Sequence, residues 1–581
     1  MRKIKLCGFF IFFLFNFCFA QDNQDFDKII VTKSQNFDLN QYYLDSESIS
    51  YLPFSSPIES LNTLPIDLQA RSPKASIQTD FSLRGSNYEG VAVLLEGTRI
   101  NDPQTGHHNS DVPLTSEDIS RINVDGRSID FIIRRPEYRR VILEASGGQY
   151  NTFSGLASVS EKIKDLGVRV SIENKESDGF REDTDFKKFT ASFASALDIP
   201  LGSVDTDFGF QEKEFGAFDF YTPGKGYQSK EWTKTYLLNT KADINKYGLS
   251  IKPDFLWRRH FDKFMLDKTN IRSNFLSHHR TDIFTPSLYF KKNAMILGDI
   301  GLGLEYGQEK INSTTLGKHT REHKSVYLDD AYNFTDQLSS GVSFRWDDFD
   351  SFGKSYTGSL NLRYELDRQN AFKIGISRYV RIPSFTEIYY NDPTTIGNLG
   401  LSPEKSITYE AGYELKKEIF SWGTTIFLRR EDNYIDWVKS SQTQAKWQTE
   451  NIASSDVFGI EESLQAKLNK YIELNANYIY TNRKLDDNGY IYKYGPNYSR
   501  HIVNSTLLFN LPFGTQELGF TYKKKPLRDG WFLLSSKLNY NINKNAKVFL
   551  SVTNILNVEY QEIEGIPQPG RWVESGMRLE W

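Results

Sequence analysis

Hydrophobic and polar residues alternate over long stretches between residues 138 and 581. In 372–377 and 407–415, every second residue is apolar or aromatic, and most residues between them are polar. The same period of two recurs in 473–480 and 548–553. Successive side chains of a β-strand point to opposite faces, so this pattern predicts many strands with one apolar and one polar face.

Two architectures fit such strands, a large soluble β protein and a β-barrel that spans an outer membrane. The chain has 581 residues, of which 39% are hydrophobic and 14% aromatic, and its mean hydropathy is −0.51. A membrane barrel is polar on average because half of each strand faces a wet lumen. A helical membrane protein is excluded, because each spanning helix needs about 20 consecutive apolar residues and the longest run, 9–15, is shorter.

The final segment favours a closed barrel. Counting back from Trp581, the apolar residues Leu579 and Met577 share its face, whereas Arg578 and Glu580 lie on the other. A last strand that reaches the chain end can pair with the first strand and so remove all sheet edges.

The N-terminus has the three parts of a secretory signal peptide, which we place at residues 1–20. Basic residues in 1–7 precede an aromatic-rich apolar run at 8–17, and small residues lead to a cleavage position after Ala20. A buried helix, a membrane anchor and lipidation of Cys18 are the alternatives. Both cysteines, Cys7 and Cys18, fall in this segment, so the exported chain would hold neither a disulfide nor a cysteine metal site.

Residues 21–44 form a polar tail with one exception, 26–32. Ile29, Ile30, Val31 and Thr32 are β-branched and extend readily. An isolated strand-former in a polar tail is suited to strand addition at the sheet edge of a partner protein. The alternative is an ordinary first strand of the next domain.

Residues 45–137 are predicted to form a compact αβ domain. The continuous apolar run 91–95 predicts a strand buried on both faces. Residues 101–109 follow it and contain Pro, Gly, Asn and Asp, which predict a turn-rich loop. The net charge of −4, without a clustered basic surface, gives no indication of nucleic-acid binding.

An ordered set of short motifs resembles the TonB-dependent outer-membrane receptors along the whole exported chain. Residues 27–32 look like the TonB box, closest to that of cobalamin (vitamin B12) receptors, and 83–85 and 93–101 look like strands of the receptors' plug domain. Residues 381–390 with 397–405 are similar to a block of the receptor barrel. Further barrel motifs follow in family order at 434–437, 451–461, 554–560 and 569–571.

The resemblance implies an all-β membrane barrel of 22 antiparallel strands at 138–581, with an N-terminal αβ plug, 45–137, inside its lumen. It also implies a monomer in the lipid of the outer membrane that imports a scarce, bulky nutrient with energy from TonB. Cobalamin is the leading substrate and a ferric siderophore the alternative. A secreted β-rich binding or adhesion protein is the alternative from another class. The stretch 122–135 departs from the family pattern, so the plug boundary near Glu137 is approximate.

The candidate binding residues fall into three groups. The resemblance assigns TonB binding to the box, and substrate binding to the loop 101–109 and to a second segment at 389–391. Side chains of the loop offer many hydrogen-bond donors and acceptors, and aromatic residues beside amides suit a large ring-bearing ligand. The alternatives are a loop that contacts the barrel wall and an ordinary loop rim. The residues are Asp27, Ile29, Ile30, Val31 and Thr32 for TonB, and Asn101, Asp102, Gln104, Thr105, His107, His108, Asn109, Tyr389, Tyr390 and Asn391 for the substrate.

No metal, cofactor or enzymatic activity is predicted. The adjacent side chains of His107 and His108 converge poorly on one ion, and no arrangement of nucleophile and base stands out. Haem receptors of the family carry a histidine between the positions of Arg381 and Leu401, and none is present here, which disfavours haem. Other groups considered for haem, metal or Ca²⁺ are His278, His279, His319 and His323, and the acidic residues Asp178, Glu182, Asp183 and Asp185, which lack EF-hand spacing.

Overall fold

A computed structural model describes residues 42–72, 74–270, 276–294, 298–392, 394–485 and 489–581. The predicted signal peptide and TonB box lie outside these residues. Within the described part of the chain, none of the helices is both long enough and apolar enough to cross a membrane.

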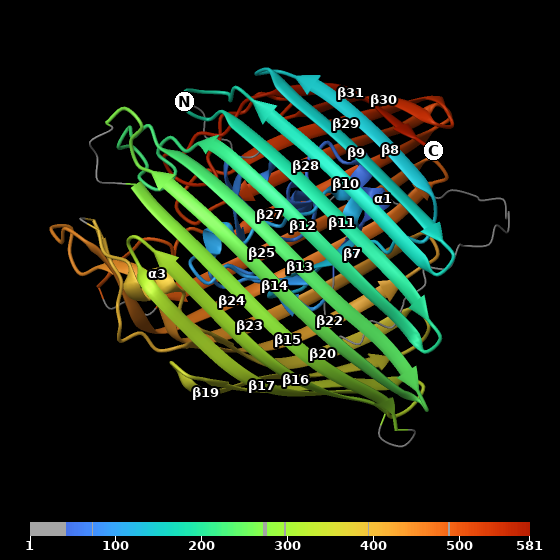
Figure 1. Ribbon diagram of the computed structural model, residues 1–581, viewed down its shortest axis with the longest axis horizontal. Helices are drawn as coiled ribbons and strands as arrows, with labels where there is room; N and C mark the ends of the chain where they lie inside the picture. The colour runs from blue at the N-terminus through green and yellow to red at the C-terminus, as the bar shows by residue number, and fades with distance from the viewer. Residues whose placement is uncertain (1–41, 73, 271–275, 295–297, 393, 486–488) are drawn as a thin grey trace, which may run out of the picture. The chain divides into compact units, whose positions relative to one another are not determined.

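The described strands from β8 onward form a closed antiparallel barrel (Figure 1). Two-residue strands β21 (Thr395–Ile396) and β26 (Ile491–Tyr492) lie in loops and are bypassed by direct pairing of β20 with β22 and of β25 with β27. The predicted 22-stranded barrel is thereby confirmed. Its strands are β8 (Arg140–Gly148), β9 (Thr152–Ile163), β10 (Leu166–Ser177), β11 (Phe186–Ile199), β12 (Gly202–Gly216), β13 (Lys230–Lys246), β14 (Leu249–Met265), β15 (Leu276–Asn293), β16 (Asp299–Ser313), β17 (Gly317–Asn333), β18 (Leu338–Phe349), β19 (Gly353–Glu365), β20 (Asn370–Arg381), β22 (Glu404–Lys416), β23 (Phe420–Lys439), β24 (Trp447–Asn469), β25 (Ile472–Leu485), β27 (His501–Leu511), β28 (Gly514–Lys524), β29 (Trp531–Asn543), β30 (Ala546–Thr553) and β31 (Trp572–Glu580).

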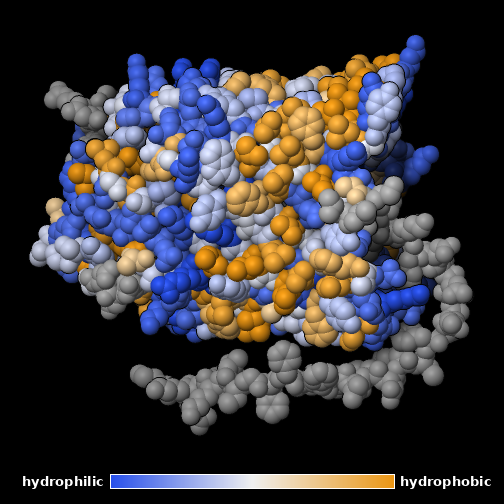
Figure 2. All heavy atoms as spheres, turned by 90° about the horizontal axis from the view of Figure 1, so that it is seen from below, coloured by the Kyte–Doolittle hydropathy of each residue, from blue (hydrophilic) through white to orange (hydrophobic). Residues whose placement is uncertain are grey.

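The apolar face of these strands points outward. Phe372, Ile374 and Ile376 are 48%, 55% and 40% exposed, as membrane-facing residues must be in the absence of lipid. Figure 2 shows hydrophobic side chains gathered on the outer face of the barrel and hydrophilic ones toward its left end. On β31, Met577 is exposed and Arg578 is buried, so the polar face lines the lumen.

Pairing of the last strand with the first closes the barrel. β31 pairs with β8 over seven residues, from Glu574 opposite Gly148 to Glu580 opposite Ile142. The closure predicted from the final segment is therefore confirmed.

A smaller domain occupies the lumen, where a five-stranded mixed sheet of order β1-β6-β7-β4-β5 packs on a two-stranded sheet, β2-β3 (Figure 1). Its sheet begins at Tyr42, slightly before the predicted domain start at Asp45, and ends at Ile133. Its elements are β1 (Tyr42–Asp45), α1 (Ser46–Tyr51), α2 (Pro57–Ser60), η1 (Leu61–Thr63), β2 (Asp67–Ser72), η2 (Lys74–Ser76), β3 (Gln78–Ser82), β4 (Ala92–Leu95), β5 (Thr98–Arg99), η3 (Gly106–His108), η4 (Ser116–Asp118), β6 (Ile119–Val124) and β7 (Ser128–Ile133).

The prediction that β4 is buried on both faces is wrong for one face. Val93 and Leu95 are fully buried in the core of this small domain, which also contacts Leu237 of β13. Ala92 and Leu94 are half-buried and line a cavity toward the barrel wall. An apolar sequence run cannot distinguish a dry core from the wall of a polar cavity.

The two ends of the barrel differ in the length of their connections. At one end, β13 and β14 are joined by residues 247–248 alone, whereas at the other end β12 and β13 are joined by 217–229. The helix α3 (Phe385–Tyr389) lies in another long connection, between β20 and β22.

Candidate functional site

Asn101 fastens the start of the loop 101–109 to its own domain. Its Nδ2 donates to the carbonyl oxygen of Val91 at 2.8 Å, and its Oδ1 accepts from the backbone amide of Val93 at 2.8 Å. These bonds hold the loop against β4, so the Asn101 side chain has a role within the domain.

Asp102 attaches the same loop to the barrel wall. Arg258 of β14 donates from Nη1 to Asp102 Oδ2 at 2.6 Å, and Thr281 of β15 donates to the same oxygen at 3.1 Å. The backbone amide of Asp102 donates to Asn109 Oδ1 at 2.9 Å. The Arg258 and Asp102 side chains are 2% and 0% exposed, so the ion pair is shielded from water.

His107 is held between a ring and a carboxylate. It stacks on Tyr88 with ring centroids 4.0 Å apart, and its Nδ1 lies 2.8 Å from Asp80 Oδ1. Burial lowers the pKa of His107 to about 4 and outweighs the opposing charge of Asp80. The imidazole is therefore neutral at pH 7, so Nδ1–H donates to Asp80 and Nε2 is left as an acceptor.

A cavity of about 530 Å³ opens above this loop, between the small domain and the long barrel connections. Four of the predicted substrate residues in the loop line it: Gln104, Thr105, His107 and His108. The other side is formed by aromatic residues of several barrel elements. These are Tyr221, Phe264, Tyr390, Trp437, Trp447 and Tyr494, with Tyr88 from the small domain.

The three residues of the predicted barrel segment 389–391 point in different directions, and one of them reaches the cavity. Tyr390 lines the cavity, whereas Tyr389 stacks on His319 with ring centroids 3.5 Å apart. Asn391 Oδ1 accepts from Lys446 Nζ at 2.9 Å. Tyr389 ends α3, where successive side chains point in different directions. The structure thus brings Tyr390 together with the loop and directs its two neighbours elsewhere.

Sequence reasoning missed most of the aromatic lining. Tyr88, Tyr221, Trp447 and Tyr494 come from four separate parts of the chain and share no spacing. Trp437 belongs to the barrel motif 434–437 noted above. This motif was the signal in the sequence that could have identified it as a residue of the site.

Charges of both signs line the cavity in equal number. The acidic groups are Glu231, Asp262 and Asp392. The basic groups, counted among the described lining residues and apart from histidine, are Lys225, Lys439 and Lys493. The described lining contains no arginine, so the bidentate recognition of anions that arginine provides is missing from it.

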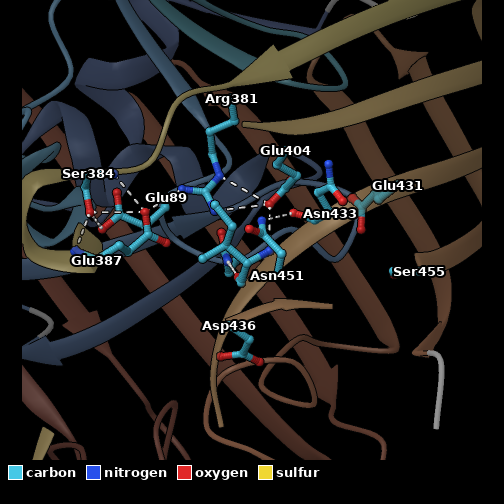
Figure 3. A network of polar contacts seen from close by, with 12 residues as sticks. Glu89, Arg381, Ser384, Glu387, Glu404, Glu431, Asn433, Asp436, Asn451 and Ser455 are labelled. Atoms are coloured by element: carbon cyan, nitrogen blue, oxygen red, sulfur yellow. Dashed lines mark hydrogen bonds and ion pairs between the residues drawn. The ribbon is translucent and has the colours of Figure 1, made fainter. Parts of the chain in front are cut away.

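A buried polar network lies next to the cavity and joins the small domain to the barrel (Figure 3). Arg381 donates from Nη1 to Glu387 Oε2 at 2.9 Å and from Nη2 to Glu404 Oε2 at 3.1 Å. Ser384 caps α3 and donates to Glu89 of the small domain at 3.3 Å. The network connects the 381–390 segment directly to residues that precede β4.

Glu89 has an unusual protonation state within this network. Burial, and next the charge of Glu387, raise the pKa of Glu89 to about 8. Thr105 of the cavity loop donates to Glu89 Oε1 at 3.2 Å. At neutral pH the carboxyl is therefore mostly protonated and links the cavity loop to α3 without adding another buried negative charge to those of Glu387 and Glu404.

Glu89→Gln is expected to flatten the dependence of stability on pH. The folded protein holds the Glu89 proton more tightly than the unfolded chain, so this contribution is complete below about pH 4.5 and is lost as the pH rises through 8. Glutamine has no proton to lose. Thermal unfolding in detergent at pH 6 and pH 9 should show a smaller loss for the variant than for the wild type. Glu47→Gln, at an exposed position, is the control, and parallel profiles for all three proteins would contradict the assignment.

Three of the four acidic residues considered for Ca²⁺ have separate partners. Asp178 Oδ2 accepts from Asn151 at 2.6 Å, Glu182 Oε1 accepts from Gln228 at 2.8 Å, and Asp183 pairs with Lys268. No described cluster of three or more ligand groups that could hold an ion contains any of the four.

A family model described as "TonB dependent receptor-like, beta-barrel" matches residues 146–555. The match covers more than half of the chain, so the chain belongs to the TonB-dependent receptors. The resemblance seen in the motifs is thus confirmed, and the small domain in the lumen is the plug of this family. Membership removes the secreted binding or adhesion protein as an alternative.

Individual relatives are distant in sequence. The vitamin B12 transporter BtuB of Photobacterium profundum is 22% identical over 476 residues, 76% of each chain. BtuB of Vibrio vulnificus is 21% identical over 292 residues, 47% of this chain and 45% of that one.

Solved structures show the same fold. The siderophore receptor PirA of Pseudomonas aeruginosa has a TM-score of 0.74 at 17% identity, covering 93% of this chain and 99% of PirA. A mutant of the ferric enterobactin receptor PfeA of the same species has a TM-score of 0.77 at 15% identity, covering 94% and 99%. At these identities the likeness concerns the fold alone.

Proposed function

We propose that the cavity above the loop 101–109 binds a bulky, ring-bearing nutrient from outside the cell, and that this nutrient is cobalamin. The observation that supports this best is the cavity itself. It joins plug and barrel residues at the end with long connections, which is the extracellular end in outer-membrane barrels. Its size lies within the range of about 300–1,000 Å³ usual for small-molecule sites.

The lining chemistry favours a ligand with little net charge. Three lysines face three acidic side chains, and Gln104, Thr105 and the neutral His107 offer uncharged donors and acceptors. Seven aromatic rings provide flat apolar surface. A corrinoid, which is a large ring with amide side chains, suits such a lining, and the named relatives in the sequence comparison are vitamin B12 transporters.

A ferric siderophore is the second candidate. Lys225, Lys439 and Lys493 could meet an anionic chelate, and the named structural neighbours are siderophore receptors. The equal number of acidic residues and the lack of arginine in the described lining weigh against a strongly anionic ligand.

Energy for import is proposed to come from TonB. Residues 27–32 would add as a strand to a sheet edge of TonB. The ligand site at the plug and the box would then be coupled sites in one chain, so that ligand binding could change the exposure of the box to TonB.

Growth of a deletion strain separates the two nutrients. We expect the strain to lose growth on limiting cobalamin and to grow normally on limiting iron, because the cavity is matched to a ligand of low net charge. The reverse result would assign a siderophore, and normal growth on both would contradict import of either nutrient.

Trp447→Ala tests the cavity on the purified receptor. Trp447 lines the cavity and its ring lies 5.0 Å from Lys439 Nζ. Loss of a stacking surface should weaken cyanocobalamin binding about tenfold or more, measured by isothermal titration calorimetry in detergent. Trp422→Ala, on β23 and outside this lining, is the matched control and should bind as the wild type does.

A further inference from the structure

Three potential ligands for a metal ion lie close together at the cavity, whose wall includes one of them, His108. His108 and Asp111 come from the plug, and His260 comes from β14 of the barrel. Their side chains are 3%, 1% and 0% exposed. One potential ligand atom from each lies within 4.8 Å of the other two.

The facing atoms of these side chains have no hydrogen-bond partner. They are Nδ1 of His108, Oδ2 of Asp111 and Nε2 of His260. A buried polar atom without a partner costs free energy, and native proteins rarely tolerate one. Three such atoms from neighbouring side chains are therefore suited to share one common partner.

The spacing of the atoms fits a bound ion. Asp111 Oδ2 lies 3.5 Å from His108 Nδ1 and 3.7 Å from His260 Nε2. Tetrahedral ligands with bonds of about 2.0–2.1 Å are separated by roughly 3.3–3.4 Å. These two separations are therefore too long for hydrogen bonds of ordinary strength and close to those of ligands around one ion.

The other atoms of the same side chains are fixed by neighbours. Thr235 Oγ1 lies 2.9 Å from His260 Nδ1, which orients the ring so that Nε2 faces Asp111. Lys213 pairs with the second carboxylate oxygen of Asp111. Partners of this kind hold metal ligands in place in known sites.

Charge in the surrounding cluster also favours a divalent cation. Its carboxylates, counted over the described residues, are Asp102, Asp111, Glu231 and Asp262, whereas its permanent cations are Lys213 and Arg258. The carboxyl groups therefore outnumber these cations, four to two.

We propose that His108, Asp111 and His260 bind a divalent transition-metal ion of the Zn²⁺ type, which links the plug to the barrel wall. Two imidazole nitrogens and one carboxylate favour such an ion over Ca²⁺ or Mg²⁺, which prefer oxygen ligands. Three protein ligands leave a fourth position for water or another group. The site does not depend on which nutrient the cavity binds.

The same histidine also belongs to a second set, with Glu231 and Asp262. Glu231 Oε2 already accepts from Tyr221 at 2.9 Å, and Asp262 Oδ2 accepts from Gln104 at 3.3 Å. His108 would have to use its opposite nitrogen, Nε2, for this set. In the second set Asp262 Oδ1 is the one potential ligand atom found buried without a partner among the described residues, whereas the first set has one such atom from each residue. The set with Asp111 and His260 is therefore preferred, and the second set becomes an outcome of the test.

Metal binding can be measured on the full receptor in detergent after treatment with a chelator and without any nutrient. We expect one Zn²⁺ per chain by isothermal titration calorimetry, and visible absorption bands of four-coordinate Co²⁺ when Co²⁺ replaces it. His260→Ala should weaken Zn²⁺ binding at least 100-fold. His278→Ala, at an exposed position on the adjacent strand β15, should leave it unchanged.

The His260→Cys variant distinguishes the loss of a metal ligand from misfolding of the His260→Ala variant. A thiolate at this position should restore binding and add a sulfur-to-cobalt charge-transfer band, which requires direct coordination by residue 260. Absence of stoichiometric binding in the wild type would overturn the proposal. Loss of binding in Asp262→Asn but not in Asp111→Asn would overturn this ligand set in favour of the second.

Discussion

The Ile30→Pro variant is expected to lose nutrient uptake completely while it still binds the nutrient at the cell surface. Proline removes a backbone N–H donor and fixes the backbone, so residues 27–32 could no longer pair fully with a strand of TonB. The cavity is formed by residues 88 and beyond and should be untouched. Uptake and surface binding of radiolabelled cobalamin by whole cells measure the two effects separately.

Ile30→Val is the matched control, because valine keeps both the donor and the β-branched shape. It should import at close to the wild-type rate. Persistent uptake by Ile30→Pro would show that residues 27–32 are not the TonB-binding strand. Parallel loss of surface binding would indicate a folding defect instead.

The Arg258→Met variant is expected to release the loop 101–109 from the barrel wall. Removing the cation leaves the Asp102 carboxylate buried without its partner, which costs about 3–5 kcal/mol for a buried ion pair. Backbone amides of the loop should then exchange with deuterium roughly 100-fold faster or more. Hydrogen–deuterium exchange with mass spectrometry on the purified receptor measures this directly.

Arg259→Met is the control on the same strand. Arg259 pairs with Asp282 at 2.6 Å, but its side chain is 36% exposed, and such pairs contribute about 1 kcal/mol or less. The loop should exchange as in the wild type. Equal exchange in both variants would mean that the Asp102 ion pair does not hold the loop.

The barrel could be predicted from sequence because its strands obey a local rule. Each outward residue such as Phe372 or Ile374 is apolar for the same reason, contact with lipid, so a period of two is visible without knowledge of neighbours. Closure was predictable as well, since the final segment carries the same alternation up to Trp581.

The interior of the lumen does not follow a local rule. Asp102 and Arg258 are 156 residues apart. From the sequence around it, each would be predicted to be an ordinary charged residue on the surface. Similarly, His107 and His108 are adjacent, yet one contacts Asp80 and the other faces residues of β14. Which polar residues meet is decided by how the plug is placed in the barrel, and no spacing in the sequence encodes that placement.

The plug contacts the barrel through polar groups on some sides and through apolar side chains on others. Hydrogen bonds and ion pairs such as Arg84 with Glu461 join them on some sides. Elsewhere Leu237, Leu256 and Ile283 of β13–β15 join the apolar core of the plug, and Phe186 of β11 and Phe215 of β12 pack in a second apolar cluster with Ala75 and Ile77 of the plug. Water can replace a broken polar contact but cannot replace an apolar one. A plug under a pulling force should therefore separate first along its polar sides and pivot on the apolar seam that these contacts form along β11–β15. The channel would then open on the side away from that seam.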